Sequence, residues 1–285
     1  MHLLAMAALV LVSFLVASIL MVVPVMLGID VQHGTGLMVA QCVAQLVMFM
    51  LPVVLMVNFY YRDERKSFLR LDFSGRKWLT GLAGVVILVL LIPAIDWLTV
   101  WNDGWDLGAV GAYLRAVQEK TEGVTEELMS ADSVGGLFAN LLVVAVVPAL
   151  CEELLFRGGI QNLLERWFGR SGKAWATHAA VWVTAIIFSL IHGELFSFMP
   201  RLLLGALLGY IYVYSGSILC NMLAHFVNNA IVVVAYWLVA RGVLDMDLEE
   251  HLRIGWMLTA ACSVGAVALF VATFVSGRDR KAINS

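Results

Sequence analysis

Long apolar runs separated by short polar connections dominate the chain. Eight of them approach or exceed the roughly 20 residues that an α-helix needs to cross a bilayer. Helices are favoured over barrel strands, because the runs do not alternate apolar and polar positions and because backbone amides in lipid must be satisfied within a segment. We therefore predict an all-α fold, a polytopic membrane helix bundle of about eight transmembrane helices around a polar intramembrane cavity, with residues 1–285 as a single membrane domain. The predicted spans are residues 3–27, 37–60, 79–101, 134–164, 175–192, 201–215, 217–240 and 254–276.

The amino-acid composition supports this class. Hydrophobic residues make up 61% of the 285 residues and charged residues 14%, with a mean hydropathy of +0.89, whereas soluble domains average about 45–50% and about 25%. The four cysteines lie inside apolar runs without CxxC spacing, and we interpret them as small buried apolar residues. The first run has no basic region before it and exceeds the ~7–15 apolar residues of a signal peptide, so we interpret it as a retained span.

Basic residues indicate the orientation of the bundle. Loop 60–78, loop 165–174 and the C-terminal tail carry 12 of the 18 Lys and Arg residues, and the opposite connections carry five. The positive-inside rule then predicts cytoplasmic termini, and we expect an integral protein of a prokaryotic inner membrane. The acidic connection 102–133 is expected to be a solvated surface loop, with a short interfacial helix as the alternative. The partner expected from the apolar composition is the lipid bilayer, and no nucleic acid is expected.

Three of the predicted spans contain polar groups that hydrocarbon tolerates only beside a partner or a cavity. These groups are Glu152, Glu153 and Arg157 in the first, His192 one turn after Phe188 in the second, and His225 and Asn229 in the third. Arg157 shares a helical face with Glu153, so an ion pair between them would leave Glu152 free. Pro148 should kink the same span and free a carbonyl near the acids.

These residues by themselves leave two interpretations open. They could form a catalytic site, or a buried polar network in a non-catalytic membrane scaffold, an immunity protein or a small-solute carrier. The Gly-x-Ser-x-Gly, His-Glu-x-x-His and Walker patterns are absent from the sequence. Cys151 adjoins the two acids, which disfavour its thiolate and therefore a role as nucleophile.

The ordered motifs resemble a known family. Glu-Glu-x-x-x-Arg at 152–157, Phe-x-x-x-His at 188–192 and His-x-x-x-Asn at 225–229 are similar to the signature of the CAAX-protease and bacteriocin-processing family, also called the Abi family. The similarity covers roughly residues 134–240, the predicted catalytic core. It implies a membrane-embedded endopeptidase that acts on a peptide or membrane-protein substrate and in which Glu152 is the catalytic carboxylate. The supporting and partner residues implied are Glu153, Arg157, His192, His225 and Asn229.

Two mechanisms fit this set of residues. In the first, Glu152 and His192 activate a water molecule while His225 and Asn229 donate to the oxyanion. In the second, a divalent metal such as zinc lies among Glu152, His192 and His225 and keeps an open position for water, as in a metalloprotease.

The depths of the two histidines present a geometric difficulty. At 1.5 Å per residue from the starts of their spans, His192 lies about 25 Å and His225 about 12 Å from the cytoplasmic side. The two side chains can meet only if their helices are tilted, displaced or re-entrant.

Overall fold

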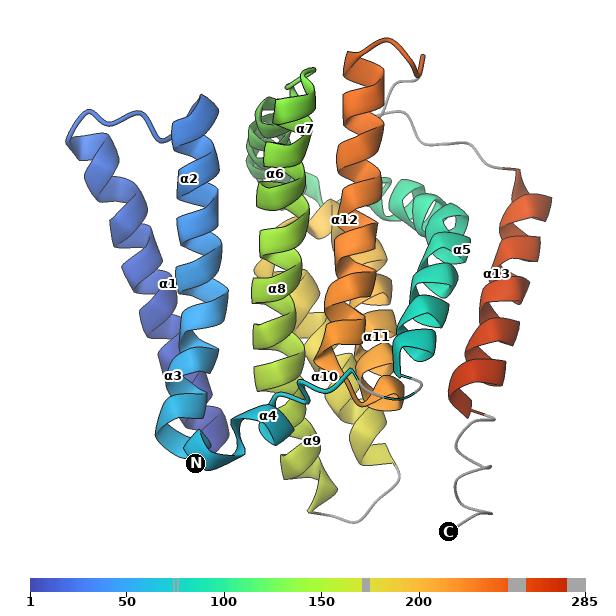
Figure 1. Ribbon diagram of the computed structural model, residues 1–285. Coiled ribbons are helices and arrows are strands. Elements are labelled where there is room, and N and C mark those ends of the chain that lie inside the picture. Colours follow the sequence, from blue (N-terminus) through green and yellow to red (C-terminus); the bar gives the residue numbers. More distant parts are fainter. Residues whose placement is uncertain (74, 76, 171–174, 246–254, 276–285) are drawn as a thin grey trace.

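The computed structural model describes all residues except 74, 76, 171–174, 246–254 and 276–285. The described residues are predominantly helical and contain no strand. Figure 1 shows an upright bundle in which the N-terminus and the end of the last described helix lie toward the same end. The predicted all-α class is confirmed.

Helical segments with the length and composition of membrane spans account for most of the bundle. Seven such segments occur among the described residues: His2–Met26, Gly34–Tyr60, Lys77–Asp103, Val134–Gly169, Leu195–Ser215, Ile218–Ala240 and Trp256–Phe274. The predicted span 175–192 corresponds to the helix Trp175–Ile191, whose 17 residues give a length of about 25 Å, less than the roughly 30 Å hydrocarbon core of a bilayer. Residues 254 and 276, which bound the last predicted span, lie outside the described residues.

Several spans combine α-helix with π-helical turns. In chain order the elements are α1 (His2–Met26), α2 (Gly34–Gln45), η1 (Leu46–Met50), α3 (Leu51–Tyr60), η2 (Arg62–Glu64), α4 (Arg65–Phe68), α5 (Lys77–Asp103), α6 (Gly108–Met129), α7 (Val134–Asn140), η3 (Leu141–Val146), α8 (Val147–Glu153), η4 (Leu154–Gln161), α9 (Asn162–Gly169), α10 (Trp175–Ile191), η5 (Leu195–Ser197), α11 (Phe198–Ser215), α12 (Ile218–Ala240), α13 (Trp256–Phe270) and η6 (Val271–Val275). The π-helical segments are η1, η3, η4 and η6. Such segments are rare and frequently mark functional positions.

The longest span, from α7 to α9, bears the two adjacent acids. Pro148 lies in the first turn of α8, directly after the π-helical segment η3. Because proline has no N–H, it cannot donate to the carbonyl of Val144 four residues earlier. That carbonyl accepts a hydrogen bond from Asn229 Nδ2 on α12 at 3.3 Å instead. The carbonyl predicted to be free is therefore used to join two of the motif-bearing helices.

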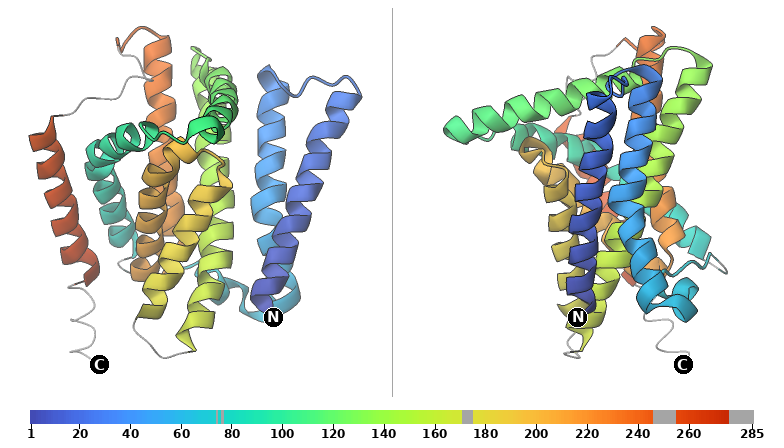
Figure 2. Two further views of the ribbon diagram at one scale, coloured as in Figure 1. Left: turned by 180° about the vertical axis from the view of Figure 1, so that it is seen from behind. Right: turned by 90° about the vertical axis from the view of Figure 1, so that its left-hand side faces the viewer.

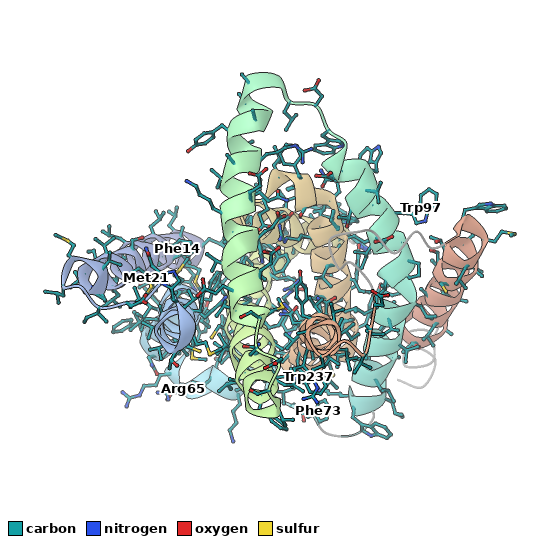
Figure 3. The ribbon with its side chains drawn as sticks, turned by 90° about the horizontal axis from the view of Figure 1, so that it is seen from above. Phe14, Met21, Arg65, Phe73, Trp97 and Trp237 are labelled. Atoms are coloured by element: carbon teal, nitrogen blue, oxygen red, sulfur yellow. The ribbon has the colours of Figure 1, made fainter. Side chains whose placement is uncertain are left out.

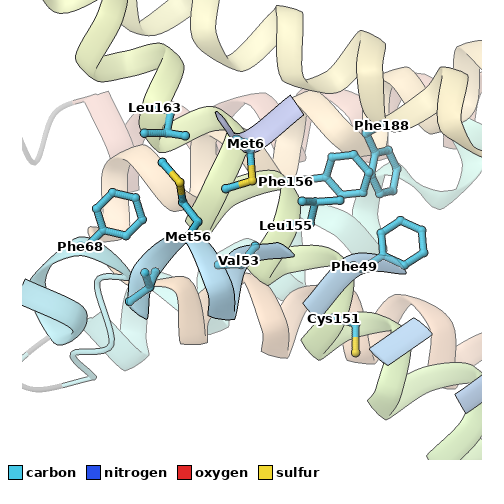
Figure 4. Packing of buried hydrophobic residues seen from close by; sticks show 11 residues of the cluster. Met6, Phe49, Val53, Met56, Phe68, Cys151, Leu155, Phe156, Leu163 and Phe188 are labelled. Carbon is cyan, nitrogen blue, oxygen red and sulfur yellow. The ribbon is translucent and has the colours of Figure 1, made fainter. Parts of the chain in front are cut away.

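The N-terminal spans pack against the acid-bearing span through an apolar cluster, shown in Figure 4. The Phe49 and Phe156 ring centroids are 6.1 Å apart, and those of Phe156 and Phe188 are 4.9 Å apart. On the outer face of α1, Leu11 and Leu15 remain 71% and 63% exposed, as expected of side chains that face lipid. The cluster holds α1, η1 and α3 against η4, the segment that contains Arg157.

The prediction of a surface loop over residues 102–133 was wrong, because most of this stretch is helical. Most of this stretch forms the 22-residue helix α6, which lies across one end of the bundle (Figures 2 and 3). Val110, Tyr113 and Val117 follow helical spacing and are 66%, 71% and 39% exposed. An uncovered apolar stripe on an otherwise charged helix is typical of a helix at the membrane interface, which was the alternative interpretation.

Candidate active site

The two histidines come from helices that begin at different levels. Figure 1 shows α9 and the start of α10 extending below the level at which α12 begins. His192 directly follows α10, whereas His225 lies in the second turn of α12. The lower start of α10 compensates for the greater distance of His192 along the chain. Displacement of one helix therefore removes the predicted difficulty.

The innermost part of the site is an ion pair shared with an imidazole. Arg157 Nη1 donates to Glu153 Oε1 at 2.7 Å, and both side chains are fully buried. His225 Nδ1 donates to the same oxygen at 2.9 Å. Arg157 Nη2 donates to the carbonyl of Gly205 on α11 at 2.8 Å. The predicted pair between Glu153 and Arg157 is present, and it joins η4, α11 and α12.

Glu152 takes no part in that ion pair. Its Oε2 lies 3.9 Å from Nε2 of His192 and 3.9 Å from Nε2 of His225. Its Oε1 accepts a hydrogen bond from Gln45 Nε2 at 3.2 Å. The Glu152 side chain is 7% exposed and that of His192 is 26% exposed, so the cluster is least covered by protein on the His192 side.

Hydrogen bonds orient both imidazole rings. His192 Nδ1 lies 2.7 Å from the carbonyl oxygen of Phe188, and this nitrogen must be the donor because a carbonyl can only accept. His225 Nδ1 donates in the same way to the Glu153 carboxylate. In their neutral forms, both rings therefore direct an unprotonated Nε2 toward Glu152.

Phe188, which precedes His192 by one turn, packs beneath the site. Its ring centroid lies 4.7 Å from that of His192 and 6.2 Å from that of His225, and its ring lies 5.2 Å from the guanidinium carbon of Arg157. Phe188 is 2% exposed. The aromatic residue of the second motif thus limits the movement of both imidazoles.

Asn229 lies beside the cluster. Its Nδ2 donates to the Val144 carbonyl, and its Oδ1 accepts from Asn228 at 3.0 Å. Among the hydrogen bonds of the described residues, none joins Asn229 to Glu152 or to either histidine. The observed role of this amide is to hold α12 against η3, whereas its predicted role as an oxyanion donor stays a prediction.

Gln45 is the site residue that sequence reasoning missed. It ends α2 just before the π-helical segment η1, in a span outside the three motifs. The available signal was an amide within an apolar run, which must find a partner when it is buried. Its Oε1 is buried and accepts no hydrogen bond from the described residues, so its amide is oriented by its single bond to Glu152.

The proposed metal ligands have suitable chemistry but unsuitable spacing. A carboxylate oxygen and two unprotonated imidazole nitrogens are groups that zinc accepts. Around a tetrahedral ion with bonds of about 2.0–2.1 Å, ligand atoms lie about 3.3 Å apart, whereas both oxygen–nitrogen separations here are 3.9 Å. Within the described part of the chain, no group of three His, Cys, Asp or Glu side chains meets the geometry of a metal site. The residues as placed do not fit a metal ion.

Comparison with known proteins agrees with the motifs. Residues 134–231 match the family described as Rce1-like, type II CAAX prenyl endopeptidase. The match covers about a third of the chain and contains all three motifs, and it confirms the family resemblance inferred from the sequence. It supports an intramembrane function of the CAAX-protease type.

Two curated relatives are similar over a longer stretch. The chain is 26% identical over 181 residues to a Bacillus subtilis (strain 168) protein named "Uncharacterized protein YpbD", covering 61% of this chain and 76% of that protein. It is 25% identical over 174 residues to an Escherichia coli protein named "Uncharacterized 24.3 kDa protein", covering 53% and 78% respectively. No solved structure gives a significant match.

Proposed function

We propose that this protein is an intramembrane endopeptidase that hydrolyses a peptide bond with a water molecule activated by Glu152. The observation that carries the proposal is the position of Glu152 Oε2, which lies 3.9 Å from each of two imidazole Nε2 atoms that are hydrogen-bond acceptors when the rings are neutral. These three groups all accept hydrogen bonds. A water molecule, which has two protons to donate, can bind Glu152 and one of the two imidazoles at the same time.

In this mechanism the water donates to Glu152 and to one imidazole, most directly that of the partly exposed His192. Glu152 removes a proton as the oxygen attacks the scissile carbonyl, and the same proton then passes to the leaving amine. One C–N bond breaks and one C–O bond forms, which yields a carboxylate and an amine. The family match makes a prenylated protein one candidate class of substrate, and other membrane-protein or peptide substrates remain equally compatible with the site.

The inner ion pair serves to position the catalytic groups. Glu153 holds His225 through Nδ1 and stabilises the imidazolium that forms if His225 takes up a proton during the reaction, as the buried carboxylate of a catalytic triad does. A protonated His225 Nε2 would donate to the oxyanion. Gln45 Nε2 orients Glu152 from the opposite side. Asn229 is proposed as the second oxyanion donor, because an amide nitrogen has two protons and its observed bond to Val144 uses one of them.

The experiment is a comparison of new protein N-termini in membranes from cells that carry the wild-type chain, Glu152→Gln or Glu122→Gln. Glu122 is an exposed acid on α6 and serves as the matched control. We expect wild-type and Glu122→Gln membranes to share cleavage products that Glu152→Gln membranes lack. Identical N-termini in all three would refute the proposal and favour a non-catalytic scaffold, immunity protein or solute carrier.

Chelation separates the metal-free mechanism from the metal-assisted one. We expect activity of the purified protein to persist after exhaustive treatment with a strong chelator. Loss of activity that zinc restores would instead assign Glu152, His192 and His225 as ligands in a rearranged site.

We also propose that both termini face the cytoplasm of a prokaryotic cell, with the protein in the inner membrane. The distribution of basic residues supports this orientation. Four of the basic residues on which this orientation rests lie outside the described residues: Lys173, Arg278, Arg280 and Lys281. Modification of single engineered cysteines in loop 60–78 by a membrane-impermeant reagent in intact and permeabilised cells tests the assignment.

A further inference from the structure

A second group of polar side chains, separate from the candidate active site, lies at the end of the bundle where α1 begins and α3 and α9 end. It surrounds a cavity of about 900 Å³, which lies within the range of about 300–1,000 Å³ typical of small-ligand sites. None of the residues of the three motifs lines it. The lining residues are Met1 to Leu4, Tyr60 to Glu64, Leu163, Arg166, Trp167 and Arg170.

Three guanidinium groups face this cavity without an acidic partner. Arg62, Arg166 and Arg170 line it, and within the described residues none of them forms an ion pair. Two carboxylates, Asp63 and Glu64, belong to the same rim. The wall contributed by α9 is entirely basic and apolar, so an anion is best accommodated there.

Arg166 is held in place by cation–π contacts with two aromatic rings. Its guanidinium carbon lies 5.4 Å from the ring centroid of Tyr61 and 4.8 Å from that of Phe68. Its Nε donates to Asn162 Oδ1 at 3.3 Å. Its two terminal nitrogens form no hydrogen bond with the described residues, and a planar guanidinium is well suited to bind an oxyanion through them.

Tyr61 adds a hydroxyl to the same wall. This hydroxyl is hydrogen-bonded to His2 Nδ1. Burial raises the pKa of the Tyr61 hydroxyl, and the positive charges of Arg166 and Arg170 oppose that rise. The negative charge of Glu64 acts in the same direction as burial, so Tyr61 lies within the electrostatic reach of both the basic and the acidic groups of the cavity wall.

The position of the cavity indicates a ligand from the membrane. It opens where apolar helices end, which is the level of lipid headgroups, and Tyr60 and Trp167 beside it are 43% and 53% exposed, as aromatic residues at a membrane interface are. Leu3 and Leu4 line the cavity, and Leu4 is 78% exposed. A soluble anion would gain nothing from these apolar side chains.

We propose that this cavity binds the headgroup of an anionic phospholipid. The phosphate lies against Arg166 and Arg170, and the glycerol and first acyl carbons lie against the leucines of α1. This binding site is separate from the proposed catalytic site and does not depend on peptide hydrolysis.

The test measures lipid binding to the purified full-length chain in neutral detergent by native mass spectrometry. Phosphatidylglycerol, phosphatidylcholine and inorganic phosphate are titrated separately. The principal variant is Arg62→Gln/Arg170→Gln, because both side chains line the cavity and are exposed. The matched control is Arg65→Gln, an exposed arginine on α4 that does not line the cavity. Arg166→Gln serves as a second variant.

We expect phosphatidylglycerol to bind more tightly than phosphatidylcholine. Each removed charge should weaken phosphatidylglycerol binding about five-fold, or about 25-fold for the double variant, while Arg65→Gln changes it less than two-fold. Equal binding of the two lipids, or equal weakening in the control, would overturn the proposal. Binding of inorganic phosphate as tight as that of phosphatidylglycerol would identify a soluble-anion site and overturn the lipid assignment.

Discussion

Removing Glu153 should cost far more stability than removing its neighbour Glu152. In Glu153→Ala, the fully buried guanidinium of Arg157 loses its only carboxylate partner at hydrogen-bond distance, and His225 Nδ1 loses its acceptor. Leaving a buried charge without its partner costs about 3–5 kcal/mol. In Glu152→Ala, the hydrogen bond lost among the described residues is that from Gln45, which contributes about 1.5–3 kcal/mol because its acceptor is charged. The middles of the two ranges differ by about 2 kcal/mol.

The assay is unfolding of the purified protein in mixed micelles, titrated with a denaturing detergent and followed by circular dichroism. Glu153→Leu/Arg157→Met is the informative double variant, since apolar replacement of both partners removes the unpaired charge as well as the pair. We expect it to recover most of the stability lost in Glu153→Ala while remaining inactive, because His225 is no longer held. Equal destabilisation by Glu152→Ala and Glu153→Ala would refute the division of these acids into one free and one structural carboxylate.

Three further outcomes follow from the same contacts. Gln45→Ala should lower peptidase activity about 10- to 100-fold, the range for loss of a supporting hydrogen bond to a catalytic group, and should lower the free energy of unfolding about as much as Glu152→Ala does, because both variants lose the same hydrogen bond; unchanged activity would show that Gln45 does not orient Glu152. Asn229→Ala should lower the free energy of unfolding by about 1 kcal/mol, since the Val144 carbonyl loses its donor, and a stability equal to wild type would contradict this role. Gly205→Val should destabilise the protein by about 1–3 kcal/mol in the same unfolding assay, because even a Cβ at this position would lie 3.2 Å from Ala185 Cα and from Phe188 Cδ1; a neutral effect would show that α10 and α11 can separate.

The apolar pattern determined the helical class and most of the spans, because a backbone in lipid has few alternatives to the helix. It also determined the pairing of Glu153 with Arg157, which depends only on helical spacing within one span. The amphipathic spacing of α6 was also visible in the sequence, but the many acidic residues of the stretch favoured the interpretation as a solvated loop over that as an interfacial helix. The length of α10 was predicted closely, but at 17 residues the helix is shorter than the segments with the length of a membrane span.

Contacts between spans were beyond the reach of the sequence. That Glu152 faces two Nε2 atoms depends on the lower start of α10 and on the bonds that Phe188 and Glu153 make to Nδ1. Gln45 meets Glu152 because an apolar cluster packs the N-terminal spans against η4, and no local periodicity reports such packing. Spacing along one helix is set by covalent geometry, while the level and rotation of separate helices are set by side-chain packing over the whole bundle, which only the tertiary structure decides.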